Sequence, residues 1–226
     1  MIEGQIDDER RGPQVDHPRF ARMFDRMASS APGQKEFGEL RRETAGRARG
    51  VILEVGAGGG YNFAYYDPAL AGRVEATEPD ETMLAYARER AARAAVPITL
   101  TQAPAEALPF DDGMFDTVVV TLVFCSVVDV PRGLSEIARV LKPGGRLLMA
   151  EHVRSTNAAL AGVQTALLPL TVRVAGNCHW NRDTASAVRQ AGFQDMQSRL
   201  IPYPSRFAQA INGSLVPILL IEASRS

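Results

Sequence analysis

A glycine-rich segment directly follows a strand-like apolar run, and it is the part of the chain whose residue types best suit ligand chemistry. Residues 53–62 read LEVGAGGGYN, and Val51 and Ile52 lead into them. Glycines after a strand let the backbone turn tightly and approach a ligand closely. The segment therefore predicts a ligand-binding turn at the end of a buried strand.

Neither common phosphate-binding pattern fits this turn. The dinucleotide fingerprint G-x-G-x-x-G needs a third glycine where this chain has Tyr61, and the P-loop needs a G-K-[ST] that does not follow. The pattern is E-x-G-x-G-x-G, from Glu54 to Gly60. A carboxylate repels a pyrophosphate but favours an ammonium or hydroxyl groups. S-adenosylmethionine, with an amino group, a sulfonium, a ribose and no phosphate, suits such a turn.

A second acid supports this interpretation. Glu78 ends the next strand-like run, RVEATEPD, about twenty residues beyond Gly56, where adenosine-binding α/β folds place a carboxylate on the ribose hydroxyls. We therefore expect Glu78 to contact a ribose.

Composition sets broad limits on the function. The chain has 226 residues, 46% of them hydrophobic and 23% charged, and a net charge of −1, which suits one globular protein and gives no support to nucleic-acid binding. No stretch has the 18 or more apolar residues of a membrane span, and the polar residues 1–13 do not resemble a signal peptide. Two cysteines make no disulfide framework, so we expect a soluble protein of the reducing cytoplasm.

Apolar patterns predict the elements that position these residues. From residue 51 onward, β-rich runs alternate with helix-period runs, which indicates an α/β fold with a doubly wound, Rossmann-like, mostly parallel sheet. The connection at 201–215 contains two prolines and the pair Asn212-Gly213, which suit a hairpin or an irregular connection, so we expect an antiparallel final strand. The predicted strands are 51–55, 73–77, 98–101, 115–121, 146–151, 194–200 and 216–223, and the predicted helices are 81–95, 132–141 and 183–191.

The N-terminal segment is expected to cover the sheet. Within residues 1–45, an apolar stripe at Phe20, Met23, Phe24 and Met27 has helical spacing. It predicts a helix that packs over the edge of the sheet or over its ligand, or one with only a structural role.

Four segments together resemble the class I S-adenosylmethionine-dependent methyltransferases of the methyltransferase type 11 group. They are LEVGAGGG, ATEPDETMLAYARERA, PAEALPFDDGMFDTVVVTLVFCSVVD and IARVLKPGGRLLMAEHV. The resemblance implies a methyltransferase domain over residues 46–226, with an acceptor-side insertion at 155–182, and S-adenosylmethionine as the cofactor, with S-adenosylhomocysteine as its product.

The resemblance also implies which residues bind the cofactor. The glycine loop matches the part that surrounds the methionine, Glu78 and Pro79 match the ribose side, and Thr121 and Leu122 match positions near the transferring methyl. On the adenine side, Pro104 replaces the usual aspartate and leaves Ala105 and Glu106 as candidates. The predicted cofactor-binding residues are Glu54, Gly56, Ala57, Gly58, Gly60, Glu78, Pro79, Ala105, Glu106, Thr121 and Leu122.

A narrower resemblance concerns the acceptor. VVVTLVFCSVVD, AEHV and GNCHWNRDTASAVRQAGF are similar to the alkyl-thiol methyltransferases, which implies a small thiol or dithiol as acceptor. The alternative is O-, N- or C-methylation of a natural product or a quinone-like ring. The alkyl-thiol methyltransferases have an apolar N-terminal membrane anchor, and the polar N-terminus of this chain does not resemble it.

Several residues are candidates for contact with the acceptor. His152 follows the fifth strand and His179 lies in GNCHWNRD, and either could accept a proton. Phe24, Cys125, Cys178 and Trp180 are candidates for the wall of the pocket. No close ligand pair such as C-x-x-C occurs, so no metal site is expected. The apolar segment 157–174 suits a core helix, a lid, a dimer surface or a membrane-surface helix, and a monomer or a homodimer is compatible with the sequence.

Overall fold

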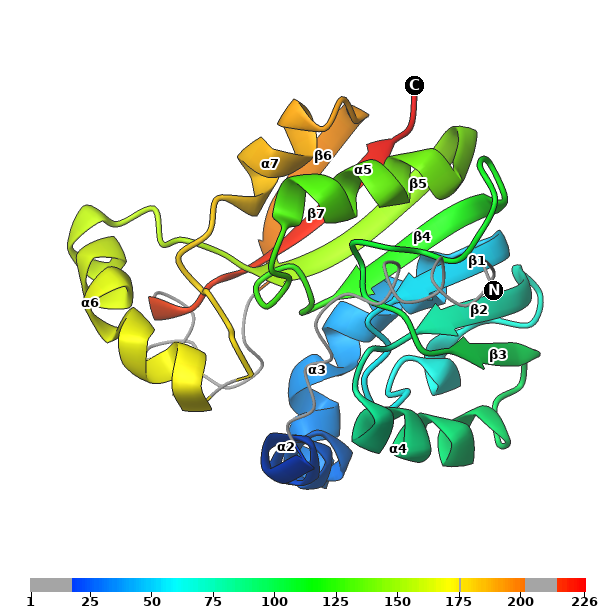
Figure 1. The fold of residues 1–226 in the computed structure, drawn as a ribbon, viewed down its shortest axis with the longest axis horizontal. Coiled ribbons are helices and arrows are strands. Elements are labelled where there is room, and N and C mark those ends of the chain that lie inside the picture. Colours follow the sequence, from blue (N-terminus) through cyan, green and yellow to red (C-terminus); the bar gives the residue numbers. More distant parts are fainter. Residues whose placement is uncertain (1–17, 175, 202–214) are drawn as a thin grey trace, which may run out of the picture.

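A seven-stranded sheet forms the centre of the molecule, whose computed structural model describes residues 18–174, 176–201 and 215–226 (Figure 1). The strand order is β3-β2-β1-β4-β5-β7-β6. The strands are β1 (Gly50–Val55), β2 (Ala71–Thr77), β3 (Ile98–Thr101), β4 (Phe115–Thr121), β5 (Leu141–His152), β6 (Gln194–Ile201) and β7 (Ile218–Ser224).

The pairing confirms a mostly parallel sheet with an antiparallel final strand. β1 lies between β2 and β4 and pairs with both in parallel, and β4 pairs with β5 in parallel. β7 lies between β5 and β6 and is antiparallel to both. The order reverses between β1 and β4, and open α/β sheets bind ligands at the carboxyl ends of the strands at such a point.

Helices cover both faces of the sheet because the strand residues alternate between two cores. Leu53 and Val118 face a core shared with α5 and α7, whereas Ile52 and Val119 face a core shared with α4. The helices are α2 (Pro18–Ser29), α3 (Ala31–Glu43), α4 (Glu81–Ala91), α5 (Val130–Val140), α6 (Ala158–Val174) and α7 (Thr184–Gln190), and short 3-10 turns lie at Ala45–Arg47 and Phe63–Tyr65.

Aspartates begin three of these helices. Asp80, Asp129 and Asp183 accept hydrogen bonds from backbone N–H groups at the starts of α4, α5 and α7. Such caps satisfy donors that have no partner within the helix. They fix the helix starts of α4 and α5 beside the carboxyl edge of the sheet, where a ligand would bind.

Some predicted boundaries are corrected. The helix predicted at 81–95 ends at Ala91, and β5 begins at Leu141 instead of residue 146, because Arg225 forms backbone hydrogen bonds with Gly144 and Gly145. The connection at 201–215 lies largely outside the described residues. Within the described ranges, no helix is long and apolar enough to cross a bilayer.

The N-terminal prediction is correct only in part. Two helices, α2 and α3, replace the one expected, and only part of the predicted apolar stripe is buried: Met23 and Met27 are exposed, while Phe20 and Phe24 are half-buried. Ala21 and Ala28 provide the fully buried positions of α2. The predicted boundary at residue 45 remains a prediction.

Candidate active site

The glycine loop leaves β1 at the carboxyl edge of the sheet. Gly56, Gly58 and Gly60 all have positive φ, a conformation that glycine adopts without the usual steric cost. At Gly60, a Cβ would lie 2.5 Å from the ring of Phe63, so a larger residue is excluded by space as well as by conformation. The N–H of Ala57 donates to the carbonyl of Thr77 at 2.8 Å and ties the loop to β2.

Glu78 closes the other side of this loop. Its carboxylate accepts a hydrogen bond from the N–H of Gly58 at 2.8 Å and from that of Asp80 at 3.0 Å. The residue is only 8% exposed, and burial raises the pKa of its carboxyl to about 7. The structure thus brings the two sequence-predicted parts, the loop and the acid, into direct contact.

Glu54 lies at the centre of a buried polar network. Its carboxylate accepts from the Asn62 amide at 3.0 Å and from the Tyr66 hydroxyl at 2.6 Å. The same amide donates to Thr121 Oγ1 at 3.1 Å, which joins the loop to the end of β4. Burial raises the pKa of Glu54 to about 7. Sequence reasoning missed Asn62 and Tyr66, because their role depends on how the chain returns to Glu54.

Arg41 of α3 is a second feature that the sequence did not predict. It is 5% exposed, and its guanidinium lies 5.3 Å from the ring centre of Tyr61, next to the glycine loop, with the rings of Phe37 and Tyr65 at 5.7 and 6.0 Å. Burial lowers its pKa. Among the described residues, no carboxylate forms an ion pair with it.

The end of β4 has an unusual backbone. Leu122 has φ 59°, a left-handed conformation that is rare for residues other than glycine, so its persistence depends on the surroundings. Glu151 of β5 supplies them. It is fully buried and accepts from the N–H groups of Val123, Phe124 and Cys125 at 2.8 to 3.1 Å. In the sequence, Glu151 stands out only as a single acidic residue within an apolar strand.

The residues predicted to lie on the adenine side contact other parts of the protein. Ala105 is buried, and Glu106 uses its carboxylate to accept from the N–H groups of Val128 and Asp129 at 2.9 and 3.1 Å. The carbonyl of Pro79 accepts from Gln102. These contacts give Glu106 a structural role at the start of α5, and its contact with adenine remains a prediction.

The N-terminal helix α2 contacts the glycine loop. The ring of Phe24 lies 5.8 Å from that of Tyr61 in an edge-to-face arrangement. Asp25 accepts from the Tyr61 hydroxyl at 3.0 Å and pairs with Arg90 of α4 at 2.8 Å. Phe24 therefore lies beside the predicted cofactor loop, and α2 is held there by charged and aromatic contacts.

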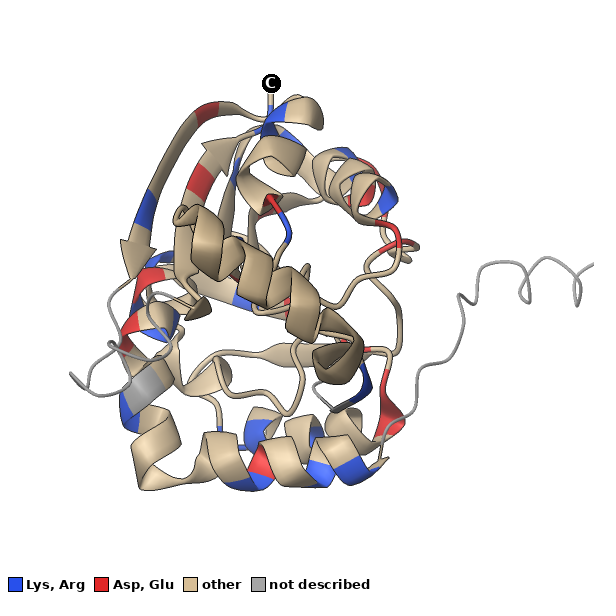
Figure 2. Cartoon of the chain, turned by 90° about the vertical axis from the view of Figure 1, so that its left-hand side faces the viewer, with Lys and Arg blue, Asp and Glu red and all other residues tan. Residues whose placement is uncertain are grey.

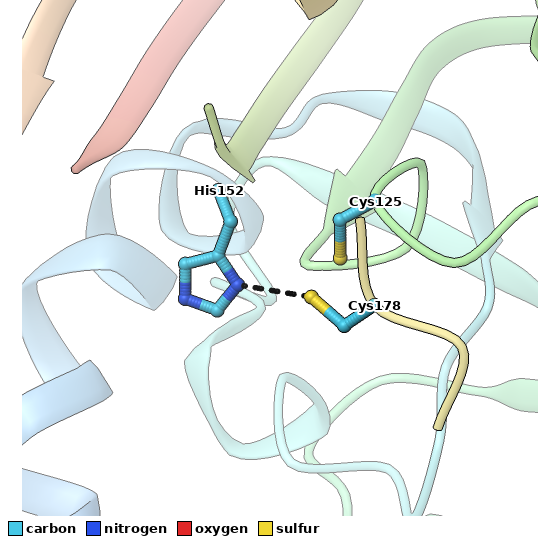
Figure 3. A group of neighbouring side chains, drawn as sticks. All are labelled: Cys125, His152 and Cys178. Atoms are coloured by element: carbon cyan, nitrogen blue, oxygen red, sulfur yellow. Dashed lines mark hydrogen bonds between the residues drawn. The ribbon is translucent and has the colours of Figure 1, made fainter. Parts of the chain in front are cut away.

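Three acceptor-side candidates meet at one point, where the carboxyl end of β5 faces the loop after β4. Cys125, His152 and Cys178 have ligand atoms within 4.8 Å of one another, and the Sγ of Cys178 is 3.7 Å from Nδ1 of His152 (Figure 3). The hydrogen bond with Cys178, and next burial, raise the pKa of the Cys125 thiol.

The other two candidates lie nearby in sequence but differ in their contacts. His179 Nδ1 lies 2.7 Å from the carbonyl of Asn177 and so donates to it. The indole N–H of Trp180 is buried without a hydrogen-bond partner among the described residues. An orphaned buried donor of this kind suits contact with a ligand, although the predicted role of both residues remains untested.

Comparison with known proteins decides the family. A methyltransferase domain model matches residues 53–149, and a model of the anamorsin N-terminal region matches residues 106–202. Thiol S-methyltransferase TMT1B of Homo sapiens is 30% identical over 175 residues, which cover 76% of this chain and 71% of that protein. The chain belongs to the class I S-adenosylmethionine-dependent methyltransferases.

Two further methyltransferases are similar to this chain, one in sequence and one in fold. Phosphatidylethanolamine N-methyltransferase of Cereibacter sphaeroides is 34% identical over 150 residues, 64% of this chain and 71% of that protein. The solved structure of a putative methyltransferase from Haloferax volcanii, in complex with the Trm112 activator, has a TM-score of 0.67 at 19% identity and covers 92% of this chain and 93% of that chain. The structural likeness confirms the methyltransferase fold predicted from the sequence.

The loop of this methyltransferase fits the cofactor that its family uses. Two buried carboxylates, Glu54 and Glu78, flank a turn with no phosphate-binding pattern, so the charge there suits hydroxyl and ammonium groups and not a pyrophosphate. Beside them, Arg41 is a buried cation that interacts electrostatically with Glu54 but forms no ion pair within 4.0 Å among the described residues, which leaves its guanidinium available to a carboxylate. S-adenosylmethionine carries all three kinds of group.

The methyltransferase also has a long helix between β5 and α7, α6, which is anchored by one polar residue. Gln164 is fully buried, donates to the carbonyls of Val153 and Trp180 at 3.1 and 2.9 Å, and accepts from the N–H of Ser155 at 2.9 Å. Figure 2 shows α6 facing the viewer as a helix with few charged residues. Gln164 thereby connects α6 to the segments next to His152 and Cys178.

Substituting Gln164→Leu is expected to destabilise the protein by about 2–4 kcal/mol, because three backbone groups lose their partners inside the protein. Chemical denaturation measures this loss, and Gln190→Leu, at the exposed end of α7, is the matched control. A loss below about 0.5 kcal/mol would mean that α6 does not depend on this anchor.

Proposed function

We propose that this methyltransferase transfers a methyl group from S-adenosylmethionine to the sulfur of a small thiol. The observation that carries the proposal is the likeness to thiol S-methyltransferase TMT1B, which extends over 175 residues and so beyond the span matched by the methyltransferase domain model. The acceptor side supports it, because an imidazole, His152, lies beside two cysteines at the edge of the sheet. A thiol needs little help to ionise near neutral pH.

The cofactor would be held by residues that the sequence and the structure single out. We assign the ribose hydroxyls to Glu78, the methionine part to the glycine loop with Glu54, and its carboxylate to Arg41. Thr121 and Leu122 would lie near the transferring methyl. When bound, the cofactor supplies a methyl group on a positively charged sulfur.

The protein's own contribution is orientation and a path for one proton. Alignment of nucleophile and methyl is worth about 7–11 kcal/mol in well-oriented systems. The rigid loop after β4, held by Glu151, and the Gln164 anchor of α6 provide fixed walls for this alignment. His152 is the candidate proton acceptor for a thiol that arrives protonated.

Arg41→Met is expected to weaken the binding of S-adenosylhomocysteine by about 10- to 100-fold, because a charge-assisted hydrogen bond contributes about 1.5–3 kcal/mol. Isothermal titration calorimetry measures this. Arg42→Met is the control, since Arg42 is exposed on the same helix. Equal affinities in both variants would show that Arg41 does not bind the carboxylate of the cofactor.

Cofactor affinity is expected to increase about tenfold between pH 6 and 8, because Glu78 has a pKa of about 7 in the free protein and accepts ribose hydroxyls best when ionised. The stability of the fold changes with pH in the opposite direction to the cofactor affinity. Since the folded pKa is raised above the ordinary value, ionisation of Glu54 and Glu78 costs stability as the pH rises from about 4.5 to about 7. Calorimetric titration with S-adenosylhomocysteine across this range, with Glu78→Gln flattening the profile, checks the assignment.

A panel of matched acceptors tests the proposed function. Purified protein with S-adenosylmethionine is incubated with small thiols and dithiols and with their alcohol and amine counterparts, and the products are identified by mass spectrometry. Methylation confined to the sulfur compounds supports the proposal. Methylation of the alcohols or amines alone would leave the fold and the cofactor in place and overturn the thiol assignment.

One observation favours a second acceptor class. Phosphatidylethanolamine N-methyltransferase matches at 34% identity, and α6 exposes the apolar residues Val163, Leu167 and Leu170, which suit an amine attached to an apolar body. A lipid-like amine in the same panel, methylated in preference to every thiol, would establish this alternative.

A further inference from the structure

The proposed reaction needs at most one proton acceptor from the group Cys125, His152 and Cys178, yet three potential metal ligands lie together there. Their separations in the sequence predicted no metal site, because no close ligand pair occurs. The fold nevertheless brings them together from three places: the loop after β4, the last residue of β5 and the loop after α6 (Figure 3). We propose that they bind one Zn²⁺ through two thiolates and one imidazole.

The distances suit such an ion. A tetrahedral zinc has Zn–S and Zn–N bonds of about 2.3 and 2.0–2.1 Å, which place a sulfur about 3.6 Å from a nitrogen ligand and two sulfurs about 3.8 Å apart. Cys178 Sγ lies 3.7 Å from His152 Nδ1, and all three ligand atoms lie within 4.8 Å of one another. Small side-chain rotations therefore suffice to bind the ion.

The ligand loops are fixed to one another by hydrogen bonds to the backbone carbonyls of the loop after β4. The N–H of His179 donates to the carbonyl of Cys125 at 2.7 Å, and the Asn177 amide donates to the carbonyl of Ser126 at 2.9 Å. Arg182 also donates to the carbonyl of Val127 at 2.7 Å. Ligands whose positions are fixed before the ion arrives are a feature of functional metal centres.

The charges and the ligand number also suit zinc. Two thiolates balance the two positive charges of the ion. Thiolate and imidazole ligands bind zinc in preference to magnesium or calcium, which prefer oxygen ligands. Among the described residues, the group holds three ligands, which leaves a fourth tetrahedral position open. Catalytic zinc sites have this arrangement of three protein ligands and one open position.

The open position suits the acceptor of the proposed reaction, and this step rests on the proposed function. A thiol that binds zinc releases its proton to water and becomes a thiolate at neutral pH, so His152, as a zinc ligand, would not act as the proton acceptor. That sulfur then forms the new bond to the methyl carbon, the methyl–sulfonium bond breaks, and its electron pair goes to the departing S-adenosylhomocysteine. The two cysteines would thus activate the acceptor without being methylated themselves.

Cobalt substitution tests the site without any need for turnover. Reduced full-length protein is titrated with Co²⁺, and we expect one equivalent to produce thiolate-to-cobalt charge-transfer absorption, which Zn²⁺ then removes. Cys178→Ser and His152→Ala should lose or shift this absorption, whereas Ser198→Ala, on an exposed position of β6 away from the three ligands, should retain it. Absence of the absorption in the folded wild-type protein would overturn the proposal.

Two further measurements complete the test. X-ray absorption of the zinc-loaded wild-type protein should show two sulfurs at about 2.3 Å and one nitrogen at about 2.0–2.1 Å, and it needs no variant to fold. A Cys125–Cys178 disulfide found in the protein as purified under reducing conditions would overturn the site. A small thiol that binds the metal should shift the cobalt spectrum. If cobalt binds but the thiol causes no shift, the acceptor does not bind the metal. If the thiol causes a shift but is not methylated, only the proposed function is contradicted.

Discussion

Glu78→Gln is expected to weaken the binding of S-adenosylhomocysteine about 100-fold. Both oxygens of the Glu78 carboxylate already accept from backbone N–H groups, at Gly58 and Asp80, and ribose hydroxyls would use their remaining lone pairs. The amide has one oxygen and no charge, so it cannot satisfy the loop and the ribose together. Two charge-assisted hydrogen bonds at about 1.5 kcal/mol each correspond to about two orders of magnitude.

The control for this variant is Glu75→Gln, because Glu75 lies on β2, the strand that leads into Glu78, and its own carboxylate pairs with Arg73. Isothermal titration calorimetry gives both affinities, and circular dichroism checks that both proteins are folded. Wild-type affinity in a folded Glu78→Gln protein would contradict the ribose assignment. Weakening in both variants would indicate a general effect of the strand instead.

Glu151→Ala is expected to lower the free energy of unfolding by about 3–5 kcal/mol and the melting temperature by about 10 °C. Removing the carboxylate leaves the N–H groups of Val123, Phe124 and Cys125 without their acceptor, and each unsatisfied buried donor costs about 1–3 kcal/mol. The left-handed conformation of Leu122 would also lose its support.

Thermal unfolding by calorimetry measures this loss. Glu89→Ala on the exposed side of α4 is the matched control, and it should change the melting temperature by less than about 2 °C. A similarly small change in Glu151→Ala would mean that the loop after β4 is fixed by other contacts.

The parts that the sequence predicted are those with local signals. β1 and β4 show continuous apolar runs because both faces of a parallel sheet are buried, and these runs predicted the strands. The glycine loop and Glu78 were predicted from their spacing, and the structure brings them into contact at Gly58.

The parts that the sequence did not predict depend on distant contacts. Arg41 comes close to the glycine loop only because α3 packs beside Tyr61. Glu151 accepts its hydrogen bonds only because the loop after β4 folds over the neighbouring strand. The helical stripe predicted a helix that packs over the sheet edge or its ligand, but Met23 and Met27 of this stripe are exposed, because the contacts of Asp25 with Tyr61 and Arg90 orient α2. The grouping of Cys125, His152 and Cys178 has no local pattern at all.

The most direct test of the proposed reaction uses an acceptor that offers both atoms in one molecule. 4-Mercaptophenol carries a thiol and a hydroxyl at opposite ends of the same ring, so size and polarity are matched. We expect incubation with S-adenosylmethionine and this protein to yield the S-methylated product, identified by mass spectrometry against both synthetic isomers. Predominant O-methylation would contradict the account.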